Sequence, residues 1–192
     1  EAKRERARAG LARLRPEVRL LADVAAAMGY AHCEGVVHRD LKPGNVILDR
    51  EERPWILDFG LAKEAPLDEA AGRVADAAEP ITVSGQMVGT PSFMSPEQVG
   101  GAVAAIGPAS DVWALGVMLY EVLTGHLPYA CATLGELLHR LQNEDPRPPR
   151  RLNPRAPADL ETVCLAALER DPARRYPEAT ALGTDLRRWL EG

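Results

Sequence analysis

Cysteine is scarce in this sequence, and the arrangement of the few cysteines excludes two kinds of site. Cys33, Cys131 and Cys164 are odd in number, lie far apart and form no CxxC or Cys/His motif. A disulfide framework or a zinc site needs paired or clustered ligands, so neither is indicated. Unpaired thiols favour a reducing, cytoplasmic compartment.

The chain is also poor in aromatic residues and has no long apolar run. Phe, Trp and Tyr make up only 5% of the 192 residues although 46% are hydrophobic, so leucine, valine and alanine must fill the core. The longest apolar run, 112–123, contains Glu121. Because a membrane span needs about 20 residues, we expect no membrane segment in this chain and interpret the run as a helix buried on all sides.

An excess of positive charge is absent as well. The formal net charge is −5, which argues against a dedicated nucleic-acid binder. Basic stretches at 3–15 and 147–155 are interrupted by acidic residues and prolines respectively, and we interpret both as solvated surface rather than binding patches.

Apolar periodicity and capping residues predict a mostly helical body with one β hairpin. Pro16 fits the first turn of a long helix, and Gly35 fits the position just past its end. The short apolar runs 46–48 and 55–57, joined by a polar segment, predict the hairpin. Further helices are expected from Pro96, from a Ser110-Asp111 cap to residue 123, and over 133–143, 158–170 and 178–190, with a Pro/Arg loop over 145–157 and a long mobile loop over 62–80.

Two motifs flank the predicted hairpin and carry a resemblance to a known family. Residues 38–45 read His-Arg-Asp-Leu-Lys-Pro-Gly-Asn, and residues 58–60 read Asp-Phe-Gly. Here the sequence resembles the eukaryotic-like (Hanks-type) serine/threonine protein kinases, whose catalytic loop and Asp-Phe-Gly motif look like these two runs. The spacing agrees, since Asn45 follows Asp40 by five residues and Asp58 follows it by eighteen.

The chemistry of phosphoryl transfer explains these residue types. It needs positioning and charge neutralisation, and a carboxylate such as Asp40 can orient an attacking hydroxyl and accept its proton. Lys42 can place a positive charge beside the phosphoryl group, while Asn45 and Asp58 offer the oxygen ligands that Mg²⁺ prefers. The resemblance implies ATP and Mg²⁺ as cofactors, with Ile47 beneath the adenine ring. Taken singly, Asp40 also fits a turn residue, Lys42 a solvated charge and Asp58 a strand-end cap.

Residues 89–97 look like the substrate-binding loop of these kinases followed by their Ala-Pro-Glu motif, with Ser95 in place of the usual alanine. The resemblance implies a buried ion pair between Glu97 and Arg175, with Arg174 as the competing partner. Breaking such a pair from one side costs about 3–5 kcal/mol.

The resemblance also implies how the catalytic loop is held, regulated and directed to its substrate. Asp111 should accept hydrogen bonds from the backbone of His38 and Arg39, and Arg39 should pair with a phosphorylated residue of the activation segment, 58–97. Thr82 and Ser84 are the candidate phosphorylation sites within that segment. Lys42 and Thr90 match the serine/threonine pattern rather than the tyrosine one, which implies protein substrates bearing Ser or Thr.

What the sequence lacks limits the resemblance to the later part of a kinase domain. No GxGxxG occurs in the sequence. In these kinases a lysine on a strand of the N-terminal lobe binds the ATP phosphates, and none of the three lysines, Lys3, Lys42 and Lys63, suits that position. We therefore expect residues 1–192 to form a kinase C-terminal lobe, mainly α with a small β hairpin, whose N-terminal lobe is absent and is supplied in cis. Such a fragment should expose apolar surface, bind nucleotide weakly and be inactive or nearly so.

Two other functions compete with the interpretation of the chain as a fragment of an active kinase. One is a truncated, pseudokinase-like scaffold for binding proteins, which the intact set Asp40, Lys42, Asn45 and Asp58 argues against. The other is a small-molecule phosphotransferase, which the Ser-Pro-Glu element at 95–97 disfavours because it builds a platform for protein substrates. The preference for arginine over lysine and the abundant alanine suggest a GC-rich bacterial source. Bacterial kinases of the family that the sequence resembles often continue into a membrane span, which would anchor a cytoplasmic kinase domain to the membrane.

Overall fold

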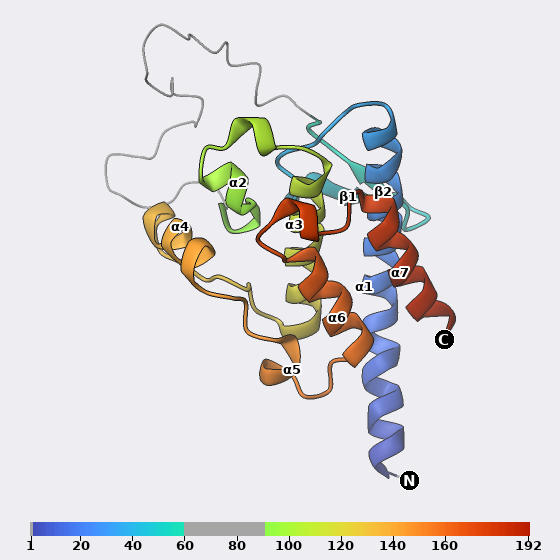
Figure 1. The fold of residues 1–192 in the computed structure, drawn as a ribbon. Helices are drawn as coiled ribbons and strands as arrows, with labels where there is room; N and C mark the ends of the chain where they lie inside the picture. Colours follow the sequence, from blue (N-terminus) through green and yellow to red (C-terminus); the bar gives the residue numbers. More distant parts are fainter. Residues whose placement is uncertain (1, 60–90) are drawn as a thin grey trace, which may run out of the picture.

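The fold is organised around α3 (Pro108–Thr124), a helix buried along most of its length. In the computed structural model, which describes residues 2–59 and 91–192, α3 packs against α1 (Ala2–Cys33), α6 (Ala158–Ala167) and α7 (Ala179–Glu191) (Figure 1). The buried helix expected over 112–123 is therefore confirmed.

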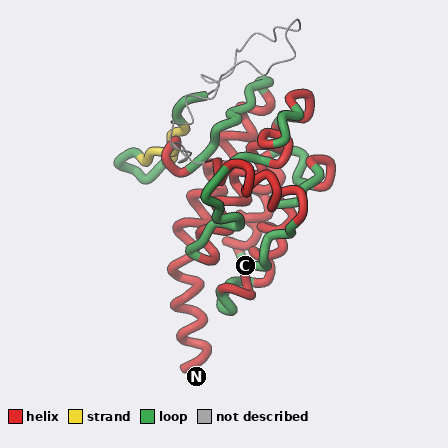
Figure 2. The backbone as a smooth tube through the Cα atoms, turned by 90° about the vertical axis from the view of Figure 1, so that its left-hand side faces the viewer, coloured by secondary structure: helices red, strands yellow, loops and turns green. Residues whose placement is uncertain are grey.

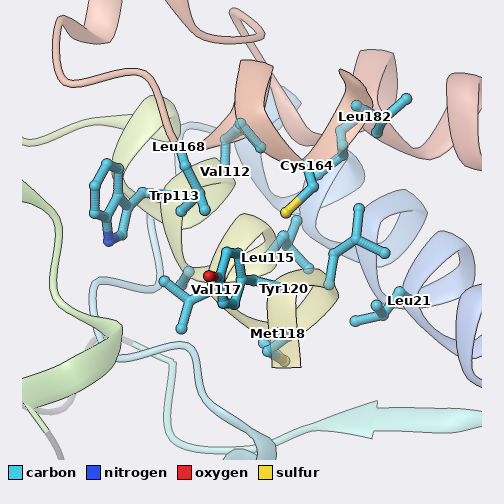
Figure 3. Packing of buried hydrophobic residues seen from close by; sticks show 14 of the residues in the cluster. Leu21, Val112, Trp113, Leu115, Val117, Met118, Tyr120, Cys164, Leu168 and Leu182 are labelled. Carbon is cyan, nitrogen blue, oxygen red and sulfur yellow. The ribbon is translucent and has the colours of Figure 1, made fainter. Parts of the chain in front are cut away.

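Aliphatic side chains fill this core, as the low aromatic content requires. Leu21 from α1, Cys164 from α6 and Leu182 from α7 gather around the side chains of α3 in Figure 3. Tyr120 lies among them and is fully buried, with its hydroxyl donating to the Arg147 carbonyl at 2.8 Å. The one polar atom of this large ring is thus satisfied inside the core.

The remaining elements are short and lie around this core. They are α2 (Pro96–Val99), α4 (Leu134–Asn143), α5 (Pro149–Leu152) and the 3-10 turns η1 (Pro43–Asn45), η2 (Pro91–Phe93), η3 (Val103–Ala105) and η4 (Pro172–Arg174). Within the part of the chain that the structure describes, none of the helices combines the length and apolar character needed to cross a bilayer. The predicted mobile loop, 62–80, lies outside the described residues.

The predicted hairpin is present and stands at the edge of the helical body (Figure 2). Strand β1 (Val46–Leu48) pairs antiparallel with β2 (Pro54–Ile56), one residue earlier than the expected 55–57. Pro54 can begin the strand because a two-stranded sheet has only edge strands, where a missing N–H costs no ladder bond. Asp49 closes the turn by accepting from the backbone N–H groups of Glu51 and Arg53.

The predicted start of α1 at Pro16 is wrong, because α1 begins at Ala2 and Pro16 lies inside it. A proline removes one backbone donor from a helix, and the residues before it are mostly Ala, Arg and Glu, which favour helix strongly. The predicted end is confirmed. Gly35 has φ +76°, its N–H donates to the His32 carbonyl, and the next N–H, of Val36, donates to Ala31, a Schellman motif.

The expected cap of α3 is also wrong, because the helix begins at Pro108 after an N-cap at Gly107. Proline is favoured at a first helical position, so Ser110 and Asp111 fall inside the first turn. There the Ser110 hydroxyl accepts from the Gly107 N–H at 3.4 Å, and the Asp111 carboxylate makes its hydrogen bonds outside the helix. Elsewhere, α6 ends at Ala167 instead of 170, and the expected 145–157 loop contains α5. Helices α4 and α7 agree with expectation, with Thr133 and Glu178 as their N-caps.

The close approach of α3 and α6 depends on Gly116. A Cβ at this position would lie 2.8 Å from the Ala167 Cβ and 3.2 Å from Leu168 Cδ2. We expect Gly116→Ala to lower the free energy of unfolding by about 1–3 kcal/mol, because overpacking forces the helices apart. Gly135→Ala on α4 is the matched control, since a Cβ there meets nothing within 4 Å. Urea denaturation of both variants measures the difference, and equal stabilities would contradict the prediction.

Candidate active site

Three of the predicted site residues form one hydrogen-bonded group between α1 and the hairpin. Lys42 Nζ lies 2.7 Å from Asp40 Oδ2. Asn45 Nδ2 donates to the Asp40 backbone carbonyl at 2.7 Å and to Asp40 Oδ2 at 3.2 Å. Both partners of the Asn45 amide nitrogen are acceptors, and no described residue hydrogen-bonds its Oδ1, so this oxygen can bind a cation. The structure therefore brings Asp40, Lys42 and Asn45 together.

Asp58 is held beside this group by its neighbours along the chain. The N–H of Leu57 donates to the Asn45 carbonyl at 2.8 Å, so Asp58 follows directly from a residue bonded to Asn45. Asp58 is exposed and has φ +59°, in the left-handed region that non-glycine residues seldom adopt. Strained backbone of this kind persists where its surroundings fix it and is common at functional sites.

His38 links the catalytic loop to the Asp-Phe pair, and its partners determine its tautomer. Its Nε2 lies 2.8 Å from the Leu57 carbonyl, which can only accept, and its Nδ1 lies 3.2 Å from the Asp40 N–H, which can only donate. The ring is therefore neutral with its proton on Nε2. It also contacts the Phe59 ring at a centroid distance of 4.9 Å, so one buried side chain contacts both motifs.

The buried carboxylate of Asp111 holds the backbone of the catalytic loop through hydrogen bonds, as expected. It accepts from the His38 N–H at 2.9 Å and the Arg39 N–H at 2.8 Å. A third partner, His32 Nε2 at 2.9 Å, was missed by sequence reasoning. A histidine on the apolar face of a helix is the signal that could have pointed to it, because a buried imidazole needs a polar partner.

The expected ion pair between Glu97 and Arg175 is confirmed, and Arg174 is excluded as its partner. Arg175 Nη1 and Nη2 each lie 2.8 Å from a Glu97 oxygen, with both side chains buried. Glu97 also accepts from the Ser110 hydroxyl at 2.7 Å. Arg174 is exposed and lies 3.5 Å from Glu169 instead. This pair fixes α2, and with it the end of the activation segment, against α3.

The hairpin exposes a set of large apolar side chains beside the catalytic loop. Ile47, the predicted adenine-packing residue, is 49% exposed and Trp55 is 59% exposed. Leu48, Leu57 and Phe59 are exposed as well, so the expected apolar surface at this end is present among the described residues. The predicted residues Lys63, Thr82, Ser84 and Thr90 lie outside the part of the chain that the structure describes.

Comparison with known proteins identifies the family. Residues 8–185 match the protein kinase domain family. The chain belongs to the protein kinase family. It is 33% identical over 178 residues to the serine/threonine-protein kinase PknB of Mycolicibacterium smegmatis, an alignment that covers 93% of this chain and 27% of the relative. It is 40% identical over 173 residues to the serine/threonine-protein kinase Pkn1 of Myxococcus xanthus, covering 88% of this chain and 23% of that kinase.

The resemblance inferred from the motifs is thus confirmed, including its bacterial relatives. The chain spans about a quarter of the length of both kinases. Within the matched family region lie the catalytic loop, the Asp-Phe pair and the ion pair of Glu97 with Arg175. The group around Asp40 therefore lies within a protein kinase domain.

Loss of Arg175 should be far more costly than loss of its neighbour. We expect Arg175→Ala to lower the free energy of unfolding by about 3–5 kcal/mol, because it leaves the Glu97 carboxylate buried without its partner. Arg174→Ala, which breaks only an exposed contact, should cost at most about 1 kcal/mol. Chemical denaturation of the two variants measures both values. Comparable losses would show that the buried pair does not hold the segment.

The same pair makes stability depend on pH. Burial raises the pKa of Glu97, but the hydrogen bonds and charge of Arg175 together with the Ser110 hydroxyl outweigh it and lower the pKa below the ordinary 4.5. A lowered pKa stabilises the fold fully above pH 4.5, and this contribution is lost as the pH falls through the folded-state pKa. We expect unfolding free energy to fall with acidification below pH 4.5 and to fall less steeply in Glu97→Gln. Parallel pH profiles would contradict this assignment.

Proposed function

We propose that the chain is the C-terminal lobe of a serine/threonine protein kinase that transfers the γ-phosphoryl group of ATP to Ser or Thr hydroxyls of proteins. The observation that carries this proposal is the state of Asp40. Its Oδ2 is engaged by Lys42 and Asn45, whereas no described residue hydrogen-bonds its Oδ1. The side chain is 46% exposed, so one carboxylate oxygen is oriented and open to a substrate hydroxyl.

In this reaction the acceptor oxygen attacks the γ-phosphorus while the bond to the β–γ bridging oxygen breaks, so ADP leaves and phosphoester forms. Asp40 Oδ1 orients the hydroxyl and takes its proton. Lys42, held 2.7 Å from Asp40, places its charge where the transferring phosphoryl group gains negative charge. The two side chains act together, because Lys42 also keeps the Asp40 carboxylate in one position.

Asn45 and Asp58 fit the cation that the family uses. The amide nitrogen of Asn45 donates to Asp40, and no described residue hydrogen-bonds its amide oxygen. Asp58 offers an exposed carboxylate. Among residues 2–59 and 91–192 there is no group of three or more metal-binding side chains, which suits Mg²⁺, since it usually takes one or two protein ligands and completes its shell with phosphate and water. When bound, Mg²⁺ neutralises phosphate charge.

The exposed hairpin supports a missing upper lobe supplied in cis. Ile47 and Trp55 present apolar surface beside the catalytic loop, and contiguous exposed apolar surface marks an interaction site. We infer that the N-terminal lobe covers this surface and that ATP lies between it and Ile47. Alone, the chain then binds nucleotide weakly and has little or no activity. The free thiols Cys33 and Cys131 favour a cytoplasmic location for the domain.

The truncated scaffold is the alternative function. A chain that only binds proteins has no need of a carboxylate oriented by Lys42 and Asn45 or of strained backbone at Asp58. The small-molecule phosphotransferase is disfavoured by the way the Glu97–Arg175 pair secures the segment that would bind a protein substrate.

Replacement of Asp40 tests the proposed function. In the complete kinase domain, Asp40→Asn should lower kcat about 10²–10⁴-fold, because the amide cannot accept the hydroxyl proton. Its KM for ATP should change little. The control is Asp159→Asn, an exposed residue of α6 with no role in the site. Transfer of labelled phosphate to a serine-containing protein substrate is the measurement, and wild-type activity in Asp40→Asn would overturn the proposal.

Arg39 suggests how the kinase is regulated. Its side chain is exposed and makes no ion pair with any described carboxylate, and its backbone is held with φ +69°. A phosphate pairs well with a guanidinium, so we propose activation by autophosphorylation at Thr82 or Ser84. The double variant Thr82→Ala/Ser84→Ala should lose most activity of the complete domain in a phosphorylation assay. Unchanged activity would exclude these two sites.

A further inference from the structure

Gln98, a residue of α2, makes a direct contact with the catalytic loop. Its Nε2 donates to the Arg39 carbonyl at 2.6 Å, across 59 residues of sequence. Its Oε1 accepts from the Ser95 N–H and the Ser95 hydroxyl, both at 3.1 Å. One amide side chain thus connects the N-cap of α2 with the backbone immediately before Asp40.

The partners of this amide allow only one orientation. The Arg39 carbonyl can only accept, so it must face the NH₂ group, and the Ser95 backbone N–H can only donate, so it must face the oxygen. The Ser95 hydroxyl adds a second donor on the oxygen side. Ser95 stands where kinases usually have alanine, and its hydroxyl therefore has a use: it helps to keep the Gln98 nitrogen directed at the catalytic loop.

The contact acts on the peptide group that joins Arg39 to Asp40. Because a peptide unit is planar, fixing its oxygen and its nitrogen fixes its orientation. Gln98 holds the oxygen, and His38 Nδ1 accepts from the Asp40 N–H at 3.2 Å. Arg39 has φ +69°, a conformation that needs support from its surroundings. The N–H of Arg39 is held separately by Asp111.

Packing does not close the space at this point. A cavity of about 10 Å³, close to what one water molecule needs, lies between the catalytic loop and the segment 93–98 and is lined by Arg39, Asp40, Phe93 and Gln98 among others. The side-chain amide therefore links two segments that are incompletely packed against each other. Without it, the 39–40 peptide would have room to turn.

We propose that Gln98 is a positioning residue that transmits the placement of α2 to Asp40. This inference rests on the proposed kinase function. The Glu97–Arg175 pair fixes α2, and the adjacent Gln98 hydrogen-bonds the catalytic loop. The end of the activation segment and the Asp40 carboxylate are therefore held in a fixed position relative to each other. The side-chain hydrogen bonds of Gln98 among the described residues go to Ser95 and Arg39, so we expect its effect to reach the reaction through the backbone that carries Asp40.

Gln98→Glu separates this role from helix capping. The glutamate can still accept from the Ser95 N–H and hydroxyl, and Ser-x-x-Glu is itself a capping box, but it presents an acceptor to the Arg39 carbonyl. In the complete kinase domain we expect kcat to fall about tenfold, as for the loss of one hydrogen bond, with KM for ATP and for the protein substrate changed less than about twofold. Ser95→Ala should lower kcat less. The matched control is Gln142→Glu, an exposed position on α4.

A second readout does not depend on activity. In the 192-residue chain, hydrogen exchange of the Asp40 amide, followed by NMR, should quicken about tenfold in Gln98→Glu while exchange in the core of α3 stays unchanged. Loss of capping alone would speed exchange in α2 and leave Asp40 as in the wild type. If Gln98→Glu does not fold, Gln98→Met, of similar length and without charge, replaces it in both measurements.

The outcomes distinguish this inference from the proposed function. An active wild type whose Gln98 variants keep kcat within twofold and leave Asp40 exchange unaltered would overturn the positioning role. An inactive complete domain in which Gln98→Glu still quickens Asp40 exchange would overturn the kinase function and keep the link.

Discussion

The buried carboxylate of Asp111 is the interaction on which the site depends. It accepts hydrogen bonds from two consecutive N–H groups of the catalytic loop and from His32 on α1. A buried charge is tolerated only when it is fully hydrogen-bonded. Moving α1 or the loop away from α3 would take hydrogen-bond partners from the Asp111 carboxylate, and this cost holds the three segments together. By accepting from these two N–H groups, Asp111 holds Arg39 in a left-handed backbone conformation with φ +69°. The turn at Arg39 directs Asp40 towards Lys42 and Asn45.

A second anchor starts from the residue before Asp111. The Ser110 hydroxyl donates to Glu97, whose carboxylate is also held by Arg175. The first turn of α3 therefore holds the catalytic loop through one residue and the end of the activation segment through the next. The turn is available because Gly107 and Pro108 begin the helix, so Asp111 is not needed as its cap, while the Ser110 hydroxyl also accepts from the Gly107 N–H at 3.4 Å. Gln98 then joins the catalytic loop and α2 directly through its bond to the Arg39 carbonyl. The backbone next to Asp40 is therefore held by both Asp111 and Gln98.

Sequence reasoning found the parts of the site that lie close together in the chain or in motifs with fixed spacing. The hairpin, the Asp111 contacts, and Arg175 instead of Arg174 agree with it. It failed where two local signals competed. Pro16 and Ser110 are each suitable for a helix start, yet favourable neighbours extend α1 past Pro16, and Pro108 precedes Ser110 as a better first position. The Gln98–Arg39 bond could not be foreseen, because it joins segments 59 residues apart and depends on a backbone conformation that no local pattern encodes. His32 had a weak signal, its place on an apolar helix face.

The group around Asp40 and the exposed hairpin differ in how firmly the described residues hold them. Asp40, Lys42 and Asn45 are ordered by contacts within residues 32–175 of this chain, so the group that we propose for the substrate hydroxyl forms within the chain itself. Ile47 differs, because it is half exposed on a two-stranded hairpin and a small sheet of this kind is only marginally stable by itself. His38 connects the two regions through Leu57 and Phe59. In the proposed kinase, nucleotide binding therefore depends on the lobe that we infer to cover the hairpin, and through His38 that lobe would also bear on the backbone next to Asp40.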